Sequence, residues 1–399
     1  MANTLLTPTK ITREALRILH QKLNFVGTIN RQYDDSFAQT GAKIGDTLCI
    51  RLPNQFTVRT GATLQAQDVA ETSVSLQIAT QKGVDINFSS SELTLTIDDF
   101  AKRYLNPAMA VLAANIESDA LTMINDVYNQ APVATAANAL DLKTTLNGKK
   151  ILDDNLAPPD DRTALLTTQN MVDLITDVKG LFQDSASLSK QYKTGMMGTT
   201  AGFDFYQNTL VGKFTSGTEP ASTTIQVNGA NQTGASVTVT NGSSKTLKKG
   251  DVISFVGCNR VHPETKADTG VKQQFVVTAD VATSGTSIPI SPSIVTSGAT
   301  QNVTASPTSG QSIVKVIDAS KVYDNSLLYH KDAFAFATAD LTLPKDVHFA
   351  AREVQDGISM RIWQASDIIN DKFPCRIDIL YGFKTIRPQL ACRLASNAA

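Results

Sequence analysis

The sequence predicts a mixed α/β chain that is interrupted by an all-β insert at residues 223–317. Inside the insert, Val, Ile and Thr alternate with polar residues, and Gly, Asn, Ser and Pro clusters separate the strand-sized runs. Several such strands at this spacing predict a small barrel or sandwich. Both flanks show helix and strand patterns, so we expect the host domain to be discontinuous. The runs are Ser236–Thr240, Asp251–Val256, Gln274–Thr278, Ser287–Ile290 and Ser312–Ile317.

The composition indicates a chain that associates with itself. Its 399 residues contain 36 Lys and Arg against 37 Asp and Glu, and charged residues make up 18%. A near-zero net charge argues against a protein whose main affinity comes from wrapping nucleic acid. A low-charge surface has little colloidal repulsion, which favours association over the alternative of an ordinary soluble protein.

No segment is predicted to cross a membrane or to act as a signal peptide. The longest apolar stretch, 108–116, is far too short to span a bilayer. The cysteines lack the spacing of a metal site, so we interpret them as small buried hydrophobic residues in a reducing compartment. They are Cys49, Cys258, Cys375 and Cys392.

An amphipathic helix is predicted near the N-terminus, with Thr12 as its cap. Its apolar stripe is Leu16, Leu19, Leu23 and Val26, and its other face is expected to carry Arg13, Arg17 and Lys22. A solvated helix face is the favoured interpretation of these charges, and a partner-docking face is the alternative.

Residues 46–91 predict two alternating strands separated by a polar stretch that has almost nothing to bury. We place a turn at Gln81-Lys82-Gly83. An isolated two-stranded arm is marginally stable, so it needs a neighbour to rest on or folds back over its own domain.

The strongest helix prediction covers residues 107–130. Asn106 is expected to cap it and Pro107 to take the first helical position, after a short helix through Tyr104. One apolar stripe runs along it, formed by Leu112, Ile116, Ala120, Met123 and Val127. A helix over 141–155, a strand over 163–167 and a helix over 167–182 follow.

The sequence nominates no catalytic, cofactor-binding or metal-binding residues. Its histidines are scattered, and it has no nucleophile elbow, phosphate loop or dinucleotide fingerprint. Carboxylate pairs such as Asp153-Asp154 are interpreted as caps and turns, and Gly382 and Pro388 as the bend and stop of a strand. A structural protein is the expected class.

Three stretches carry a resemblance to a known family: AGFDFYQ before the insert, LKKGDVISFVG inside it, and CRIDILYGFKTIRPQL near the end. In this order they resemble the major capsid (coat) proteins of tailed bacteriophages with the Hong Kong 97 fold. They are most similar to the branch typified by the coat protein of the Salmonella podophage, which carries an inserted β-barrel. The resemblance covers nearly the whole length.

The resemblance implies an α+β fold of the Hong Kong 97 type with an all-β inserted domain. By it, the N-terminal arm is 1–45, the extended β-hairpin loop 46–92, and the spine helix of the peripheral domain 93–130. The axial domain is 131–222 and 318–345, the inserted β-barrel domain 223–317, and the closing peripheral and axial strands 346–399.

The resemblance also implies function and partners. The chain is expected to form hexamers and pentamers of an icosahedral shell around packaged double-stranded DNA, with a scaffolding protein and a portal protein as partners. It implies assembly in the host cytoplasm, a place in the virion, and no enzymatic activity. The alternatives are a β-rich adhesin or tail-associated binding protein, for which the insert would be the binding part, and an encapsulin-like cargo shell.

Two sets of residues are candidates for contacts in such a shell. Charged and amide residues of the extended loop and of the insert's charged loop 260–272 are expected at subunit boundaries, and the basic N-terminal helix is expected on the interior side. The subunit-contact set is Arg51, Arg59, Gln65, Gln67, Asp68, Glu71, Arg260, Glu264, Lys266 and Lys272, and the interior set is Arg13, Arg17 and Lys22.

Overall fold

The structure is a computed structural model in which the chain divides into two compact units. The first comprises residues 1–51, 73–121 and 334–386, and the second 52–72, 122–333 and 387–399. The described residues are 8–33, 46–64, 66–67, 71–89, 101–132, 139–178, 199–220, 222–241, 245–282, 285–345, 347, 349–365 and 372–396.

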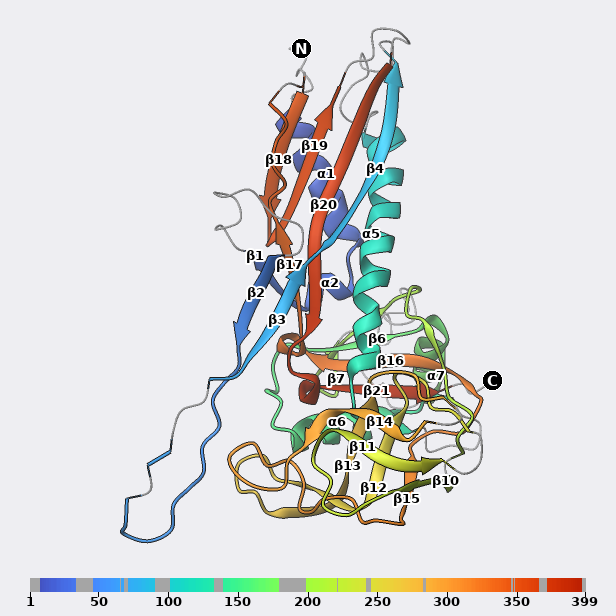
Figure 1. Ribbon diagram of the computed structural model, residues 1–399. Helices are drawn as coiled ribbons and strands as arrows, with labels where there is room; N and C mark the ends of the chain where they lie inside the picture. The colour runs from blue at the N-terminus through green and yellow to red at the C-terminus, as the bar shows by residue number, and fades with distance from the viewer. Residues whose placement is uncertain are drawn as a thin grey trace. The chain divides into compact units, whose positions relative to one another are not determined.

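The first unit is a sheet flanked by helices (Figure 1). Its strands run in the order β1-β17-β20-β19-β18, and β4 pairs with β20 along the length of β4. The strands are β1 Asn30–Tyr33, β4 Thr80–Ser89, β17 Phe334–Ala339, β18 Phe349–Gln355, β19 Ile358–Gln364 and β20 Lys372–Thr385. The helices are α1 Pro8–Lys22, α2 Phe25–Thr28 and α5 Asn106–Leu121, the last preceded by a π-helical turn Ala101–Leu105.

The second unit contains a sheet and a closed barrel. The sheet order is β5-β21-β16-β6-β8-β7, with β9 also pairing with β16. Its strands are β5 Gln130–Pro132, β6 Arg162–Leu166, β7 Thr199–Thr200, β8 Phe203–Gln207, β9 Lys213–Thr215, β16 Val322–His330 and β21 Ala391–Ser396. Helices α6 Leu142–Asp154 and α7 Thr168–Val178 and the 3-10 turns Thr122–Asp126, Lys331–Ala333 and Pro388–Leu390 complete it.

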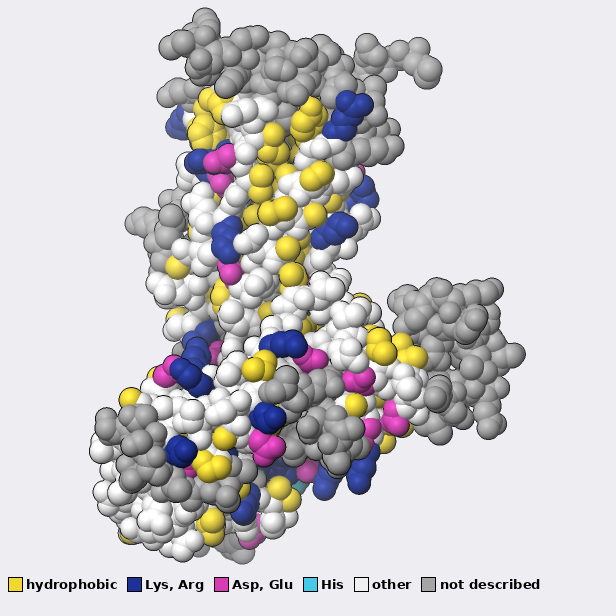
Figure 2. All heavy atoms as spheres, turned by 90° about the vertical axis from the view of Figure 1, so that its right-hand side faces the viewer, with side chains coloured by type: hydrophobic (Ala, Val, Ile, Leu, Met, Phe, Trp, Pro, Cys, Tyr) yellow, Lys and Arg dark blue, Asp and Glu magenta, His cyan; other side chains and the backbone are white. Residues whose placement is uncertain are grey.

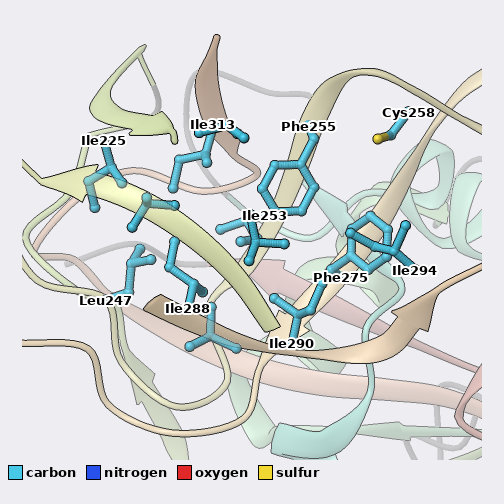
Figure 3. Packing of buried hydrophobic residues seen from close by; sticks show 14 of the residues in the cluster. Ile225, Leu247, Ile253, Phe255, Cys258, Phe275, Ile288, Ile290, Ile294 and Ile313 are labelled. Carbon is cyan, nitrogen blue, oxygen red and sulfur yellow. The ribbon is translucent and has the colours of Figure 1, made fainter. Parts of the chain in front are cut away.

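The insert is a closed six-stranded barrel in the order β10-β11-β14-β13-β12-β15, which decides between barrel and sandwich. Its core consists of inward-facing aliphatic and aromatic side chains, including the tilted ring pair Phe255–Phe275 (Figure 3). The sequence pattern produces this core because every second residue of each strand faces inward. The strands are β10 Ser222–Val227, β11 Gly234–Asn241, β12 Val252–Val261, β13 Asp268–Val277, β14 Ser287–Ile294 and β15 Ser312–Lys315.

The long helix keeps its predicted stripe, because Leu112, Ile116, Ala120, Met123 and Val127 are all buried. Its ends differ from the prediction. The π-helical turn runs directly into Asn106, and the chain beyond Leu121 tightens into the 3-10 turn. The start of the short helix that was expected to run through Tyr104 lies outside the described residues.

Two glycines that were expected to bend the chain instead lie inside strands. Gly83 is in the middle of β4, where an added Cβ would fall on the carbonyl oxygen of Ile377. Gly382 lies in β20, and its Cβ would fall on the carbonyl oxygen of Gln77. The expected turn at 81–83 and the bend at 382 are therefore wrong, since each glycine permits a close backbone approach.

Three further expectations are corrected. The N-terminal helix begins at Pro8, so Thr12 is a buried helical residue and does not cap it. Cys49 is exposed on β2 Asp46–Arg51, whereas the other three cysteines are buried. Asp153 and Asp154 lie at the C-terminal end of α6, where carboxylates oppose the helix dipole and are compensated by arginines.

Candidate assembly surfaces

The extended loop exposes large hydrophobic side chains on a two-stranded stem. Strands β2 Asp46–Arg51 and β3 Ser73–Ile78 pair antiparallel along their whole length. Beyond them Phe56, Val58 and Leu64 are 59%, 94% and 82% exposed. Large apolar side chains exposed to water mark an interaction surface, so this loop is the first candidate.

Two of the candidate loop residues hold the loop in shape. The Gln67 amide spans the loop, since Oε1 accepts from the Thr57 N–H at 2.9 Å and Nε2 donates to the Thr57 carbonyl. The Arg59 guanidinium donates to the carbonyl oxygens of Gly61 and Thr63. These local bonds pre-order an otherwise exposed loop, a role that the sequence did not reveal.

The remaining loop candidates are divided by position. Arg51 and Glu71 are exposed at the base of the loop, and Gln65 and Asp68 lie outside the described residues.

The charged segment 260–272 is a hairpin formed by the ends of β12 and β13, around a turn at 262–267. Arg260 does not project, because its Nη2 lies 2.8 Å from Asp154 Oδ2 of α6 and its side chain is only 12% exposed. Lys266 folds back, with Nζ 3.3 Å from the Gln301 carbonyl oxygen, and burial lowers its pKa. Glu264 and Lys272 are exposed and remain the candidates for outside contacts.

A hollow of about 310 Å³ lies beside this hairpin. The Arg260–Asp154 pair, His262 and Lys150 supply polar groups, and two exposed apolar side chains, Leu156 and Val271, also line it. Its mixed lining suits a side chain of another protein.

The N-terminal helix is part of the first unit's core. Leu16, Leu19, Leu23 and Val26 are buried, and α1 contacts β18 and α5. The helix therefore packs through its apolar stripe and exposes its charged residues to solvent, which is the interpretation that the sequence favoured.

The three basic residues of α1 do not share one face. At about 100° per residue, Lys22 lies about 180° around the axis from Arg13. Arg13 Nη2 lies 3.6 Å from Glu353 Oε1, and the Arg17 guanidinium donates two hydrogen bonds to the Glu14 carboxylate. That hydrogen bond from Arg17 lowers the pKa of Glu14. All three cations are nevertheless exposed.

The outer face of α5 is a surface that the sequence reading missed. Pro107, Val111, Asn115 and Ser118 are exposed on it, and none is charged. Figure 2 shows a band of hydrophobic side chains on this side of the first unit. The available signal was the run 106–116, which contains no charged residue at all. Because this exposed helix face carries no charge, it is a further candidate for contact with a partner.

The described residues contain neither a candidate metal site nor a candidate membrane helix. Among them, no three His, Cys, Asp or Glu side chains are grouped to hold a metal ion. In the same residues, no helix has the length and apolarity needed to cross a bilayer. Burial raises the pKa of the Cys258 thiol to about 11 and that of Cys392 to about 12, which leaves both protonated and unreactive.

The fold and these surfaces can be compared with known proteins. A family model described as "P22 coat protein - gene protein 5" matches residues 26–393, which is most of the chain. The chain belongs to the P22 coat protein family. It is therefore a structural subunit of a viral capsid, a component of the virion that assembles with copies of itself.

Several solved structures are similar to this coat protein. A chain from Mycobacterium phage Che8 is 11% identical, with a TM-score of 0.44, and the match covers 93% of this chain and 90% of that one. A capsid chain of cyanophage P-SCSP1u is also 11% identical, with a TM-score of 0.45 and coverages of 93% and 86%.

The insert has its own relative. The CUS-3 coat protein I-domain is 30% identical over 23% of this chain and 94% of that chain, with a TM-score of 0.19. None of the curated protein sequences that were compared matches the coat protein.

Proposed function

We propose that this coat protein assembles as hexamers and pentamers of an icosahedral shell that encloses packaged double-stranded DNA, and that the extended loop makes the contact between neighbouring copies. The observation that carries the proposal is the loop itself. It exposes Phe56, Val58 and Leu64 while Gln67 and Arg59 hold its shape. A pre-ordered arm loses less conformational entropy when it docks.

The parts of the subunit take the roles that the family resemblance assigns. Residues 1–45 form the N-terminal arm, 46–92 the extended loop and 93–130 the spine helix segment. The axial domain comprises 131–222 and 318–345, the inserted domain 223–317 and the closing strands 346–399.

The remaining partners follow from charge and position. A near-neutral chain suits a shell that encloses DNA without binding it tightly, since tight DNA binding requires many basic contacts. Exposed Arg13, Arg17 and Lys22 suit an acidic segment of a scaffolding protein, and a portal protein completes the shell. Assembly takes place in the host cytoplasm, and the subunit has no catalytic activity.

A triple substitution tests the role of the loop. Replacing Phe56, Val58 and Leu64 with serine removes the exposed apolar surface while leaving Gln67 and Arg59 in place. We expect a folded monomer that no longer forms closed shells, as measured by velocity sedimentation and negative-stain microscopy. A double variant, Val172→Ser with Val354→Ser, serves as the control because these valines are 54% and 40% exposed elsewhere on the chain.

Normal shells from the triple variant would contradict the proposal. Loss of shells in both the triple variant and the control would show a general sensitivity to surface hydrophobicity instead of a specific role of the loop.

A further inference from the structure

The base of the barrel contains a buried cation where the chain enters and leaves the insert. Lys315, at the end of β15, has a fully buried side chain. Its ammonium group donates to the Ser216 hydroxyl, to the Gly217 carbonyl at 2.9 Å and to the Glu219 carbonyl at 3.2 Å. The outgoing strand is thus tied to the incoming segment 216–219.

Asp251 supplies the counter-charge and joins a third segment to this cluster. It is fully buried, with Oδ1 3.4 Å from Lys315 Nζ. Its Oδ2 accepts from the backbone N–H groups of Gly217 at 3.0 Å and Lys248 at 2.8 Å. A Cβ at Gly217 would lie 2.8 Å from Asp251 Oδ2, so a glycine is required for this approach.

A second buried cation reaches the barrel from the last strand of the chain. Arg393, in β21 of the sheet, is fully buried, and its Nη2 donates to the Gly250 carbonyl at 2.5 Å. The guanidinium lies 5.5 Å from the centre of the Phe214 ring. Burial lowers the pKa of Arg393 to about 10, and Asp251 opposes that shift.

An amide pair and an apolar cluster complete the contact between barrel and sheet. The Gln274 side chain of β13 accepts from the Gln130 N–H at 2.7 Å and donates to the Gln130 carbonyl at 3.0 Å. It therefore bonds to β5 as a neighbouring strand would. Tyr128, Val252 and Val276 pack together beside it.

We infer that Arg393 and Gln274 are positioning residues that fix the inserted barrel in one orientation on the sheet of the second unit. The contacts of Lys315 and Asp251 with segment 216–219 form a clasp that closes the barrel's base. Arg393 and Gln274 hold that base against β21 and β5. Apart from the two peptide connections, the Arg260–Asp154 pair also joins β12 of the barrel to α6, but its aspartate is 36% exposed. Directional bonds to buried groups from separate segments remove the barrel's freedom to swing.

The consequence for assembly rests on the proposed function. The hairpin with exposed Glu264 and Lys272 belongs to the barrel. Fixing the barrel therefore fixes where that hairpin meets a neighbouring copy.

Spin labels on the full-length monomer test the inference apart from shell assembly. One label replaces exposed Lys143 on α6 and the other exposed Thr240 on β11, in a Cys49→Ser background that removes the exposed thiol. Double electron–electron resonance should give one narrow distance distribution in the parent protein. We expect Arg393→Met and Gln274→Met each to broaden it at least twofold, with unchanged circular dichroism.

The control is Lys248→Met, which removes an exposed ion pair with Asp280 within the barrel and should leave the distribution narrow. Narrow distributions in both Arg393→Met and Gln274→Met would overturn the inference. If Arg393→Met does not fold, Gln274→Met decides the outcome, because it alters no charged group. Since the readout is taken on monomers, it stands whether or not the loop builds shells.

Discussion

At the scale of single residues, the structure separates charges that shape this protein from charges that face outward. Arg59 and Arg260 are both candidates for contacts at subunit boundaries. Within this chain, the exposed Arg59 guanidinium donates to a carbonyl oxygen of its own loop, and Arg260 pairs with Asp154. Sequence alone could not distinguish Arg260 from Lys272, because its partner Asp154 lies 106 positions away in the chain. Glu264 and Lys272 keep the exposure that an outside contact needs.

Arg13 and Arg17 lie on one side of α1 and Lys22 on the other, so the expected scaffold contact can be tested one side at a time. Arg13→Glu with Arg17→Glu reverses two neighbouring exposed cations, and the salt-screened attraction to an acidic scaffold segment should weaken. We expect reduced scaffold binding that becomes indistinguishable from the parent at high salt, as measured by co-sedimentation across a salt titration. The matched variant is Lys22→Glu, which changes the charge on the opposite side of the helix.

Equal scaffold binding by parent and double variant at every salt concentration would assign these arginines a purely structural role. An equal loss of scaffold binding in Lys22→Glu would show that the net charge of α1 matters and that the side of the helix on which the charge lies does not.

At the scale of elements, strand patterns were predicted well where one face is buried and poorly elsewhere. The runs in β11, β13 and β14 were predicted because their alternation creates the barrel core. The hairpin ends 260–261 and 268–272 were expected to be loop because charged residues and Gly270 interrupt the alternation that marks a half-buried strand. Closure by β10 and β15 pairs strands more than eighty residues apart, which no local pattern encodes.

Glycine was the least reliable signal among the elements. Gly83 and Gly382 were expected to turn or bend the chain, whereas each lies in a strand crossed closely by another backbone. A glycine in an alternating segment indicates either a turn or a close approach, and only the neighbouring strand decides which.

The clasp at Lys315 predicts where the insert's folding unit ends. A fragment 216–320 keeps the oxygens of Ser216, Gly217 and Glu219, whereas a fragment 223–317 leaves the buried ammonium without them. Both fragments should fold, with the longer one more stable by about 3 kcal/mol, on the order of two hydrogen bonds to a charged group. Urea unfolding followed by circular dichroism measures the difference.

The control is a fragment 223–324, which restores length only at the C-terminal side and should match the shorter fragment. Equal stability of all three fragments would show that the clasp does not contribute to the barrel's folding.

At the scale of the whole molecule, the sequence already predicted a structural subunit. Near-zero charge, a two-stranded arm and the absence of catalytic motifs favoured that class, and the coat protein family confirms it. The outer face of α5 and the barrel–sheet joint were not predicted. The joint brings together residues as distant as Asn129, Gly250 and Arg393, and such buried polar contacts have no periodic signature in the sequence.

Cryo-electron microscopy of particles assembled from the full-length protein and a scaffold tests the central claim most directly. We predict closed icosahedral shells in which residues 52–72 lie against a neighbouring subunit, with Phe56, Val58 and Leu64 covered. Particles in which this loop folds back on its own subunit, or a protein that stays monomeric at every concentration, would contradict the account.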